Sequence, residues 1–191
     1  MAETLNRCPV LLREVAHLDA AMAYVKSRRC AVDGGAHAGL WSERLVGLFE
    51  RVVAFEPWKG HHDEFRKRVP GAELMGCALG DALGVVGVRG GADNDGQFHV
   101  DPHGATVPVF PLDDLSLEDV DFLKLDVEGY ELHALRGAGQ TISACRPVVL
   151  LEENGLCARY GVAPGAAGKW LQERGYRMAE VVNKDQVWVP S

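Results

Sequence analysis

The sequence predicts an α/β fold, in which helices cover both faces of a mostly parallel sheet. Short apolar segments alternate along the chain with segments whose apolar residues recur every three or four positions, the pattern of buried strands alternating with amphipathic helices. A glycine-rich turn, GGAHAG at residues 34–39, separates the first strand-like segment from a helical pattern. Parallel neighbours need long crossover connections, and the intervening helices supply them.

The first part of the chain carries three strand-like segments. A stripe of apolar residues between Leu11 and Val25 predicts a helix at residues 11–28, which packs on the sheet or forms a wall of the substrate site. The elements after it are predicted as a strand at 30–33, a helix at 41–49, a strand at 51–56, a weaker helix at 58–69 and a strand at 72–79.

Glycines mark the middle of the chain. The stretch GDALGVVGVRGGADNDG at residues 80–96 indicates a hairpin and a mobile loop. The later elements are predicted as strands at 107–110 and 120–126, a helix at 129–136, a strand at 147–153, a helix at 164–174 and strands at 176–182 and 186–189. The last two strands form a hairpin, so we expect one antiparallel strand in the sheet. We divide the chain into an N-terminal helical segment at 1–29 and a single domain at 30–191.

Composition narrows the class of protein. The chain has 191 residues, of which 47% are hydrophobic and 25% charged, as in an ordinary folded domain. Its formal charge of −7 disfavours nucleic acid as a partner, because phosphate backbones attract basic surfaces. Five separated cysteines without a CxxC pair fit a reducing compartment. We find no secretory signal and no apolar run of membrane-spanning length, so we expect a cytoplasmic protein outside the membrane.

Carboxylates stand where several predicted strands end, the edge at which ligands bind in parallel sheets. Asp33 precedes glycines at 34, 35 and 39, a spacing that differs from the GxGxxG of dinucleotide-binding loops. An acidic residue at this place suits an ammonium or hydroxyl group better than a pyrophosphate. Glu56 follows Asp33 by 23 positions, close to the offset at which a carboxylate meets ribose hydroxyls. The pair indicates a site for an adenosyl ligand.

These segments resemble a known family. VDGGAHAGLWSERL, followed by VVAFEP, resembles motif I and the ribose-binding acid of Rossmann-like S-adenosylmethionine-dependent methyltransferases. LKLDVEGYELHALRGA, followed by RPVVLLEEN, is similar to segments of the FkbM family of O-methyltransferases. The resemblance covers about residues 31–153. It implies a seven-stranded Rossmann-like methyltransferase sheet and S-adenosylmethionine as the cofactor.

The resemblance also implies which residues contact that cofactor. The loop from Asp33 to Gly39 would wrap the methionine end, and Glu56 would hold the ribose. The third-strand segment at residues 77–81 would border the adenine, with Trp58 either covering the adenine or packing the nearby helix. The implied cofactor residues are Asp33, Gly34, Gly35, Ala36, His37, Gly39, Glu56, Pro57, Cys77, Ala78, Leu79 and Asp126.

Asp126 and Glu128 flank Val127, so at an extended strand end they would point the same way, towards Glu152 on the next strand. We expect these acids to position the cofactor's sulfonium without a metal, although an oxygen-only cluster also suits Mg²⁺. Removal of a hydroxyl proton calls for a base. We assign catalytic roles to Asp126, Glu128 and His99, with His37 and His103 as further candidate bases, and we expect His133 and the His61–His62 pair on the surface.

The function we expect is methylation of a hydroxyl on a small molecule, saccharide or natural product. The alternatives are a protein that binds S-adenosylmethionine without turnover and a methyltransferase acting on a macromolecule. A nucleic-acid methyltransferase is disfavoured by the net charge and by Asp126-Val-Glu-Gly, which stands where a [DN]PP[YF] segment would be expected. A nicotinamide oxidoreductase is disfavoured because GxGxxG is missing. The acceptor remains open, as does assembly into a homo-oligomer.

Overall fold

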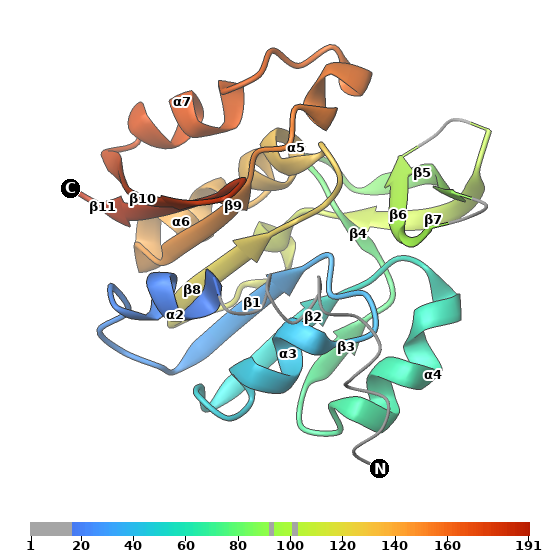
Figure 1. Ribbon diagram of the computed structural model, residues 1–191, viewed down its shortest axis with the longest axis horizontal. Coiled ribbons are helices and arrows are strands. Elements are labelled where there is room, and N and C mark those ends of the chain that lie inside the picture. Colours follow the sequence, from blue (N-terminus) through green and yellow to red (C-terminus); the bar gives the residue numbers. More distant parts are fainter. Residues whose placement is uncertain (1–16, 92–93, 101–102) are drawn as a thin grey trace.

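The computed structural model describes residues 17–91, 94–100 and 103–191, and describes side chains outside residues 90–99 (Figure 1). Its main sheet has seven strands in the order β10-β11-β9-β8-β1-β2-β3. Pairing is parallel except at β11, which runs antiparallel to both of its neighbours. The strands are β1 (Cys30–Gly34), β2 (Arg51–Phe55), β3 (Glu73–Met75), β8 (Val120–Leu125), β9 (Val148–Glu152), β10 (Tyr176–Val182) and β11 (Asp185–Pro190). The predicted α/β class and the single antiparallel strand are therefore confirmed.

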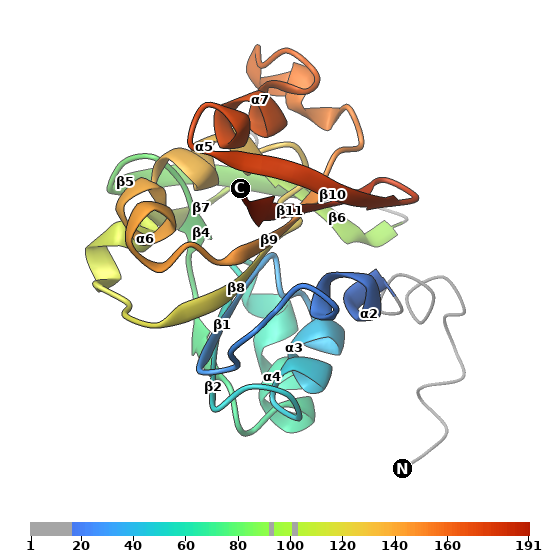
Figure 2. The same cartoon turned by 90° about the vertical axis from the view of Figure 1, so that its left-hand side faces the viewer.

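Helices cover both faces of this sheet, and Figure 2 shows the two helical layers with the sheet between them. On one face, α2 (His17–Met22) and α3 (Leu40–Leu45) bury their apolar residues against Phe122 and Leu150. On the other face lie α5 (Glu131–Arg136), α6 (Gly139–Cys145) and α7 (Ala166–Gln172). Because both faces are covered, β1 and β9 are buried along their whole length, as parallel strands usually are.

A smaller core lies under α4 (Lys59–Arg68), where Phe65 packs with Ala36 and Ala54. Ala36 belongs to the loop after β1, so this packing fixes the inner side of the glycine-rich turn. Two 3₁₀ helices complete the helical elements, η2 (Leu112–Leu115) and η3 (Leu156–Tyr160).

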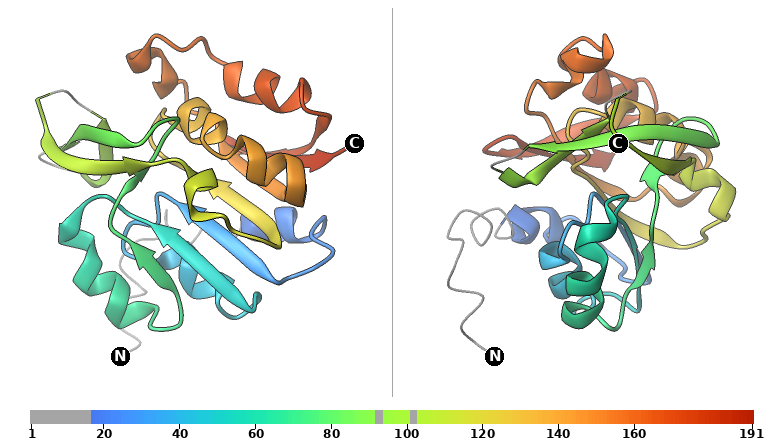
Figure 3. Two further views of the ribbon diagram at one scale, coloured as in Figure 1. Left: turned by 180° about the vertical axis from the view of Figure 1, so that it is seen from behind. Right: turned by 90° about the vertical axis from the view of Figure 1, so that its right-hand side faces the viewer.

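A second sheet of four strands, in the order β4-β7-β5-β6, lies beyond the carboxyl end of the main sheet (Figure 3). Its strands are β4 (Ala78–Leu79), β5 (Gly84–Gly91), β6 (Asn94–Val100) and β7 (Ala105–Phe110). The predicted hairpin is thus present as β5 and β6, which pair antiparallel. The amide of Gly80 donates to the carbonyl of Phe110 at 3.2 Å, so the chain enters and leaves this sheet at one place.

Two expectations need correction, and one helix was not predicted. The predicted strand at 72–79 is two strands in different sheets, because β3 ends its pairing with β2 at Met75, while Cys77 and Leu79 turn into the core beneath α5. The predicted helix at 11–28 ends at Met22, and its first residues lie outside the described ranges. The helix α6 was missed, since its sequence GQTISAC carries little apolar periodicity.

No helix within the described ranges has the length and apolar character needed to cross a membrane. The helix α2 contributes Leu18, Ala21 and Met22 to the core of the main sheet.

Gly35 provides a test of how tightly the first turn meets β8. It has a φ of +78°, and a Cβ there would lie 1.8 Å from the carbonyl oxygen of Asp126. Gly155 has the same φ of +78° with nothing within 4 Å, so it isolates the backbone strain. We expect Gly155→Ala to lower the free energy of unfolding by about 1–2 kcal/mol. Gly35→Ala should lower it by roughly 3 kcal/mol or more, because the clash adds to the strain.

Urea denaturation followed by circular dichroism measures both substitutions. Equal losses of stability in the two variants would contradict the close approach of the turn to β8.

Candidate active site

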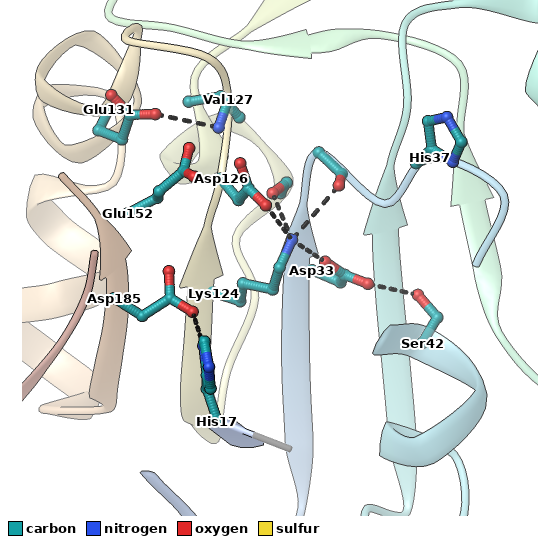
Figure 4. A network of polar contacts seen from close by, with 12 residues as sticks. His17, Asp33, His37, Ser42, Lys124, Asp126, Val127, Glu131, Glu152 and Asp185 are labelled. Carbon is teal, nitrogen blue, oxygen red and sulfur yellow. Dashed lines mark hydrogen bonds and ion pairs between the residues drawn. The ribbon is translucent and has the colours of Figure 1, made fainter. Parts of the chain in front are cut away.

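The centre of the site is an ion pair between the two middle strands of the main sheet (Figure 4). Asp33 of β1 and Lys124 of β8 are register partners, and Lys124 Nζ lies 3.0 Å from Asp33 Oδ1. Both side chains are almost completely buried, at 0% and 2% exposure. Ser42 Oγ, from α3, donates to the other carboxylate oxygen of Asp33 at 2.7 Å. The carboxylate is therefore bound on both sides by the protein.

Lys124 also contacts the glycine-rich turn. Its Nζ donates to the carbonyls of Gly34 and Gly35 at 3.4 and 3.3 Å, and it lies 3.8 Å from Asp126 Oδ2. The ammonium sits 5.2 Å from the ring centroid of Trp41. Burial lowers the pKa of Lys124, but attraction to Asp33 and Asp126 outweighs it, and the pKa is raised above its ordinary value. Lys124 is thus a cation held inside the sheet.

Most amides of the turn donate within the protein. Those of Gly35 and Ala36 both donate to the carbonyl of Phe55 at 3.0 Å, and that of Gly39 donates to the carbonyl of Ala36. The amide of His37 donates to Glu56 Oε2 at 2.9 Å. A cradle for a phosphate needs unoccupied amides. In this turn, four amides already have acceptors.

Glu56 follows β2 and is 5% exposed. Its second carboxylate oxygen accepts the amide of Trp58 at 2.8 Å, and His61 Nδ1 lies 3.4 Å from the same oxygen. The rings of His37 and His61 approach to 3.8 Å between centroids, and His62 Nε2 lies 2.7 Å from the carbonyl oxygen of Glu56. The carboxylate is held firmly, and each oxygen retains capacity to accept a further hydrogen bond.

A second group of acids gathers beyond the ends of β8 and β9. Glu152 Oε1 lies 2.5 Å from Lys184 Nζ, and its Oε2 accepts from the side-chain Nδ2 of Asn154 at 2.6 Å. Burial, together with the charge and hydrogen bond of Asp126, raises the pKa of Glu152 to about 9 despite Lys184. A small cavity of about 40 Å³ lies beside these acids. It is lined by His17, Trp41, Asp126, Glu152, Asn183, Lys184 and Asp185.

Two more acids lie at the turn between β8 and α5, with Glu128 inside the turn and Glu131 at the first position of α5. Glu128 has a φ of +56°, and burial together with the charge of Asp126 raises its pKa to about 7. Glu131 Oε1 accepts the amide of Val127 at 3.1 Å (Figure 4) and the amide of Gly129 at 3.0 Å, and the two bonds fix the turn. Burial raises the pKa of Glu131 to about 7 as well. Glu128, Glu131 and Glu152 therefore have raised pKa values near this edge, and burial also raises the pKa of Asp185 in the cavity lining.

Tyr160 of η3 connects this turn to the second sheet. Its hydroxyl accepts the amide of Val100 at 3.0 Å and lies 3.5 Å from the carbonyl oxygen of Glu128. The Tyr130 ring meets the Tyr160 ring edge-on, at 5.1 Å between centroids, and stacks on His133. The second sheet is thereby held beside the acidic turn.

The sequence of this chain matches a known protein family over most of its length. Residues 33–178, which include the end of β1, all of β8 and the acidic turn, match the methyltransferase FkbM domain. The chain belongs to the FkbM methyltransferase family.

Solved structures share the fold. The FkbM methyltransferase from Methylobacillus flagellatus KT superposes with a TM-score of 0.57 at 22% identity, over 85% of this chain and 43% of that one. This chain therefore spans less than half the length of that relative. The N-methyltransferase NodS from Bradyrhizobium japonicum WM9, in complex with S-adenosyl-L-homocysteine, superposes with a TM-score of 0.58 at 10% identity. The match covers 98% of this chain and 89% of that one. A TehB-like SAM-dependent methyltransferase from Corynebacterium glutamicum superposes with a TM-score of 0.53 at 13% identity, over 93% of this chain and 86% of that one. No curated protein matches in sequence.

The FkbM-family chain brings many of the predicted site residues together. The loop Asp33, Gly34, Gly35, Ala36, His37 and Gly39 lies between Asp126 and Glu56, and Pro57 follows Glu56 directly. In the segment at 77–79, Cys77 and Leu79 are 3% exposed and belong to the core, and Ala78 is partly exposed. His99 lies in β6 opposite Arg89, and its side chain falls outside the described residues.

The expectation that His61 and His62 lie on the surface is wrong. They are 5% and 8% exposed, because α4 turns them towards Glu56. His133 is partly buried, at 3.0 Å from Asp81.

Lys124, Ser42 and Tyr160 were missed among the residues that shape the site. A signal existed for Lys124, since a lysine within the apolar strand VDFLKL must find a buried partner. Among the described residues, no group of three or more His, Cys, Asp or Glu is arranged to hold a metal ion.

Glu152 makes stability depend on pH. Its pKa is about 9 in the folded chain and 4.5 in the absence of folding, so between these values the folded state binds more protons than the unfolded state. Stability should therefore fall as pH rises from about 5 to about 9. We expect Glu152→Gln to remove this pH dependence. As pH rises through this range, the free energy of unfolding of the variant should increase relative to that of the wild type by at most about 1.4 kcal/mol per pH unit.

Urea denaturation at a series of pH values measures this difference. Asp126→Asn removes the neighbouring charge, which should lower the pKa of Glu152 and move the upper end of the window to lower pH. Parallel stability curves for the wild type and Glu152→Gln would refute a raised pKa at this position.

Proposed function

We propose that this FkbM-family chain is an S-adenosylmethionine-dependent O-methyltransferase acting on a hydroxyl of a small-molecule, saccharide or natural-product acceptor. The observation that carries the cofactor assignment is the use of the turn amides. Those of Gly35, Ala36, His37 and Gly39 donate within the protein, so the turn offers little to a pyrophosphate. A cofactor without phosphate that carries a cationic sulfonium suits the acids at this edge.

The residues present fit such a cofactor. The loop from Asp33 to Gly39 would hold its methionine end, with Asp126 beside it, and Glu56 and Pro57 would lie at its ribose. Glu56 is suited to this because backbone amides fix its carboxylate and its oxygens can still accept from hydroxyls. Cys77, Ala78 and Leu79 would form the border of the adenine. When bound, S-adenosylmethionine supplies an electrophilic methyl group.

The chain must also accept a proton from the acceptor hydroxyl. Glu128 is the described residue we assign to this step, since a carboxyl with a pKa of about 7 is available as a base at neutral pH. Asp126 acts with it by raising that pKa and by orienting the cofactor. His99 stays a candidate for the same role.

Two observations bear on the acceptor. The second sheet borders the acidic turn through Tyr160, so we assign it to the wall of the acceptor site. The formal charge of −7 favours a small molecule or saccharide over a nucleic acid.

The rival function is that of a chain that binds the cofactor without turnover. Mass spectrometry of hydroxylated metabolites and saccharides, incubated with the protein and cofactor, separates the two by the gain of a methyl group.

Calorimetric titration tests the cofactor directly. We expect binding of S-adenosylmethionine and S-adenosylhomocysteine, and none of NAD. Glu56→Gln should weaken the binding of S-adenosylmethionine and of S-adenosylhomocysteine by roughly 1.5–3 kcal/mol each, because it replaces a charged hydrogen-bond acceptor with a neutral one. Glu43→Gln, an exposed acid on α3, serves as the control and should bind like the wild type. Tight binding of NAD alone would overturn the assignment.

Chelation tests whether the acids work without a metal. We expect transfer to an identified acceptor to persist in EDTA, because the Lys184 ammonium already lies 2.5 Å from Glu152 Oε1 and competes with a divalent cation for that carboxyl group. Loss of activity in EDTA that added Mg²⁺ restores would make the acids a metal site.

A further inference from the structure

Lys124 places a buried positive charge behind the proposed cofactor site. Figure 4 shows its ammonium among Asp33, Asp126 and the turn carbonyls. Its Nζ lies 3.0 Å from Asp33 and 3.8 Å from Asp126, and its side chain is 2% exposed. Solvent screens a buried charge far less than an exposed one. The charge of Lys124 therefore acts on anything bound at the ends of β1 and β8.

We propose that Lys124 is a positioning residue that also sets the charge selectivity of the cofactor site, limiting its preference for the cationic cofactor over the neutral product. The inference rests on the proposed function. Asp33 and Asp126 by themselves would attract a sulfonium, and Lys124 offsets that attraction.

The reason for such an offset lies in the reaction. S-adenosylmethionine carries a positive charge on sulfur, which is lost as the methyl group leaves and S-adenosylhomocysteine forms. Carboxylates that strongly stabilise the sulfonium would stabilise the ground state more than the transition state, and so would slow transfer. A buried cation beside those carboxylates reduces this ground-state stabilisation while keeping them in place.

A purely structural role predicts something different. If Lys124 only ties β8 to the turn carbonyls, its loss loosens the site for both ligands alike, because they share the methionine, ribose and adenine groups. If it sets charge selectivity, its loss changes the two affinities by different factors. The ratio of the two dissociation constants therefore distinguishes the roles, and it needs no acceptor and no turnover.

The experiment is calorimetric titration of each variant with S-adenosylmethionine and with S-adenosylhomocysteine. Lys124→Met removes the charge and keeps an unbranched side chain that is one heavy atom shorter, and it should shift the ratio about tenfold towards S-adenosylmethionine. Asp33→Asn keeps the shape of the carboxylate and its contact with Ser42, and should shift the ratio the opposite way. The double variant should return close to the wild-type ratio. Loosening of the site cannot produce shifts of opposite sign.

Lys169→Met provides the matched control, because Lys169 is exposed on α7 and its loss removes the same formal charge. Its ratio should equal that of the wild type. If Lys124→Met does not fold, the comparison of Asp33→Asn with the double variant still isolates residue 124, since the two proteins differ there alone. The double variant must then favour S-adenosylmethionine relative to Asp33→Asn.

The outcomes separate this inference from the function on which it rests. Wild-type protein that binds neither ligand overturns both. Wild-type protein that binds both, with a ratio unchanged across the Lys124 and Asp33 variants, overturns the role of Lys124 and leaves the proposed function standing.

Discussion

The ion pair between Lys124 and Asp33 is the contact on which the geometry of the site depends. Removing two charges from water is unfavourable unless their attraction and further hydrogen bonds compensate for the lost hydration. Ser42 and the carbonyls of Gly34 and Gly35 provide those bonds here. The same contacts fix the start of α3, the course of the turn and the side of β8 from which Asp126 emerges. A single buried cation thus connects three elements.

The carboxyl groups around this ion pair are bound by different kinds of partner. Glu131 is bound by backbone amides, Glu56 by the amides of two neighbouring segments, and Glu152 by Lys184 and Asn154. Glu128 has a backbone φ of +56°, a region that few residues other than glycine adopt. Strained backbone of this kind occurs often at functional sites. It places a half-buried carboxyl at the edge nearest the second sheet.

Much of the fold could be predicted from the sequence, because the main sheet is built from apolar strands and amphipathic helices whose periods are visible along the chain. The split of residues 72–79 could not, since apolar residues stand on both sides of Gly76 and the sequence does not show that they belong to two sheets. The burial of His61 and His62 also escaped prediction, because α4 has the polar sequence KGHHDEFRKR and its buried face depends on the distant Glu56.

The candidate site likewise has residues that could be predicted from the sequence and one that could not. Asp33, Glu56 and Asp126 stand at strand ends that the sequence pattern reveals, and their predicted roles towards a cofactor stay predictions. Lys124 is different, because its partner Asp33 lies 91 residues away and only the register of β1 with β8 brings the two together. A strand buried on both faces gives no alternation from which the direction of that lysine could be inferred.

The second sheet joins the rest of the chain at a narrow neck, where Gly80 and Phe110 are hydrogen-bonded to each other. Segments whose two ends meet can change in length or be exchanged without moving the elements outside them. Residues 81–109 therefore form a unit that can diversify separately from the main sheet, outside its contacts with His133 and Tyr160. Over evolution, the chain can vary this appendage while the buried charges and the strands that carry them stay constant.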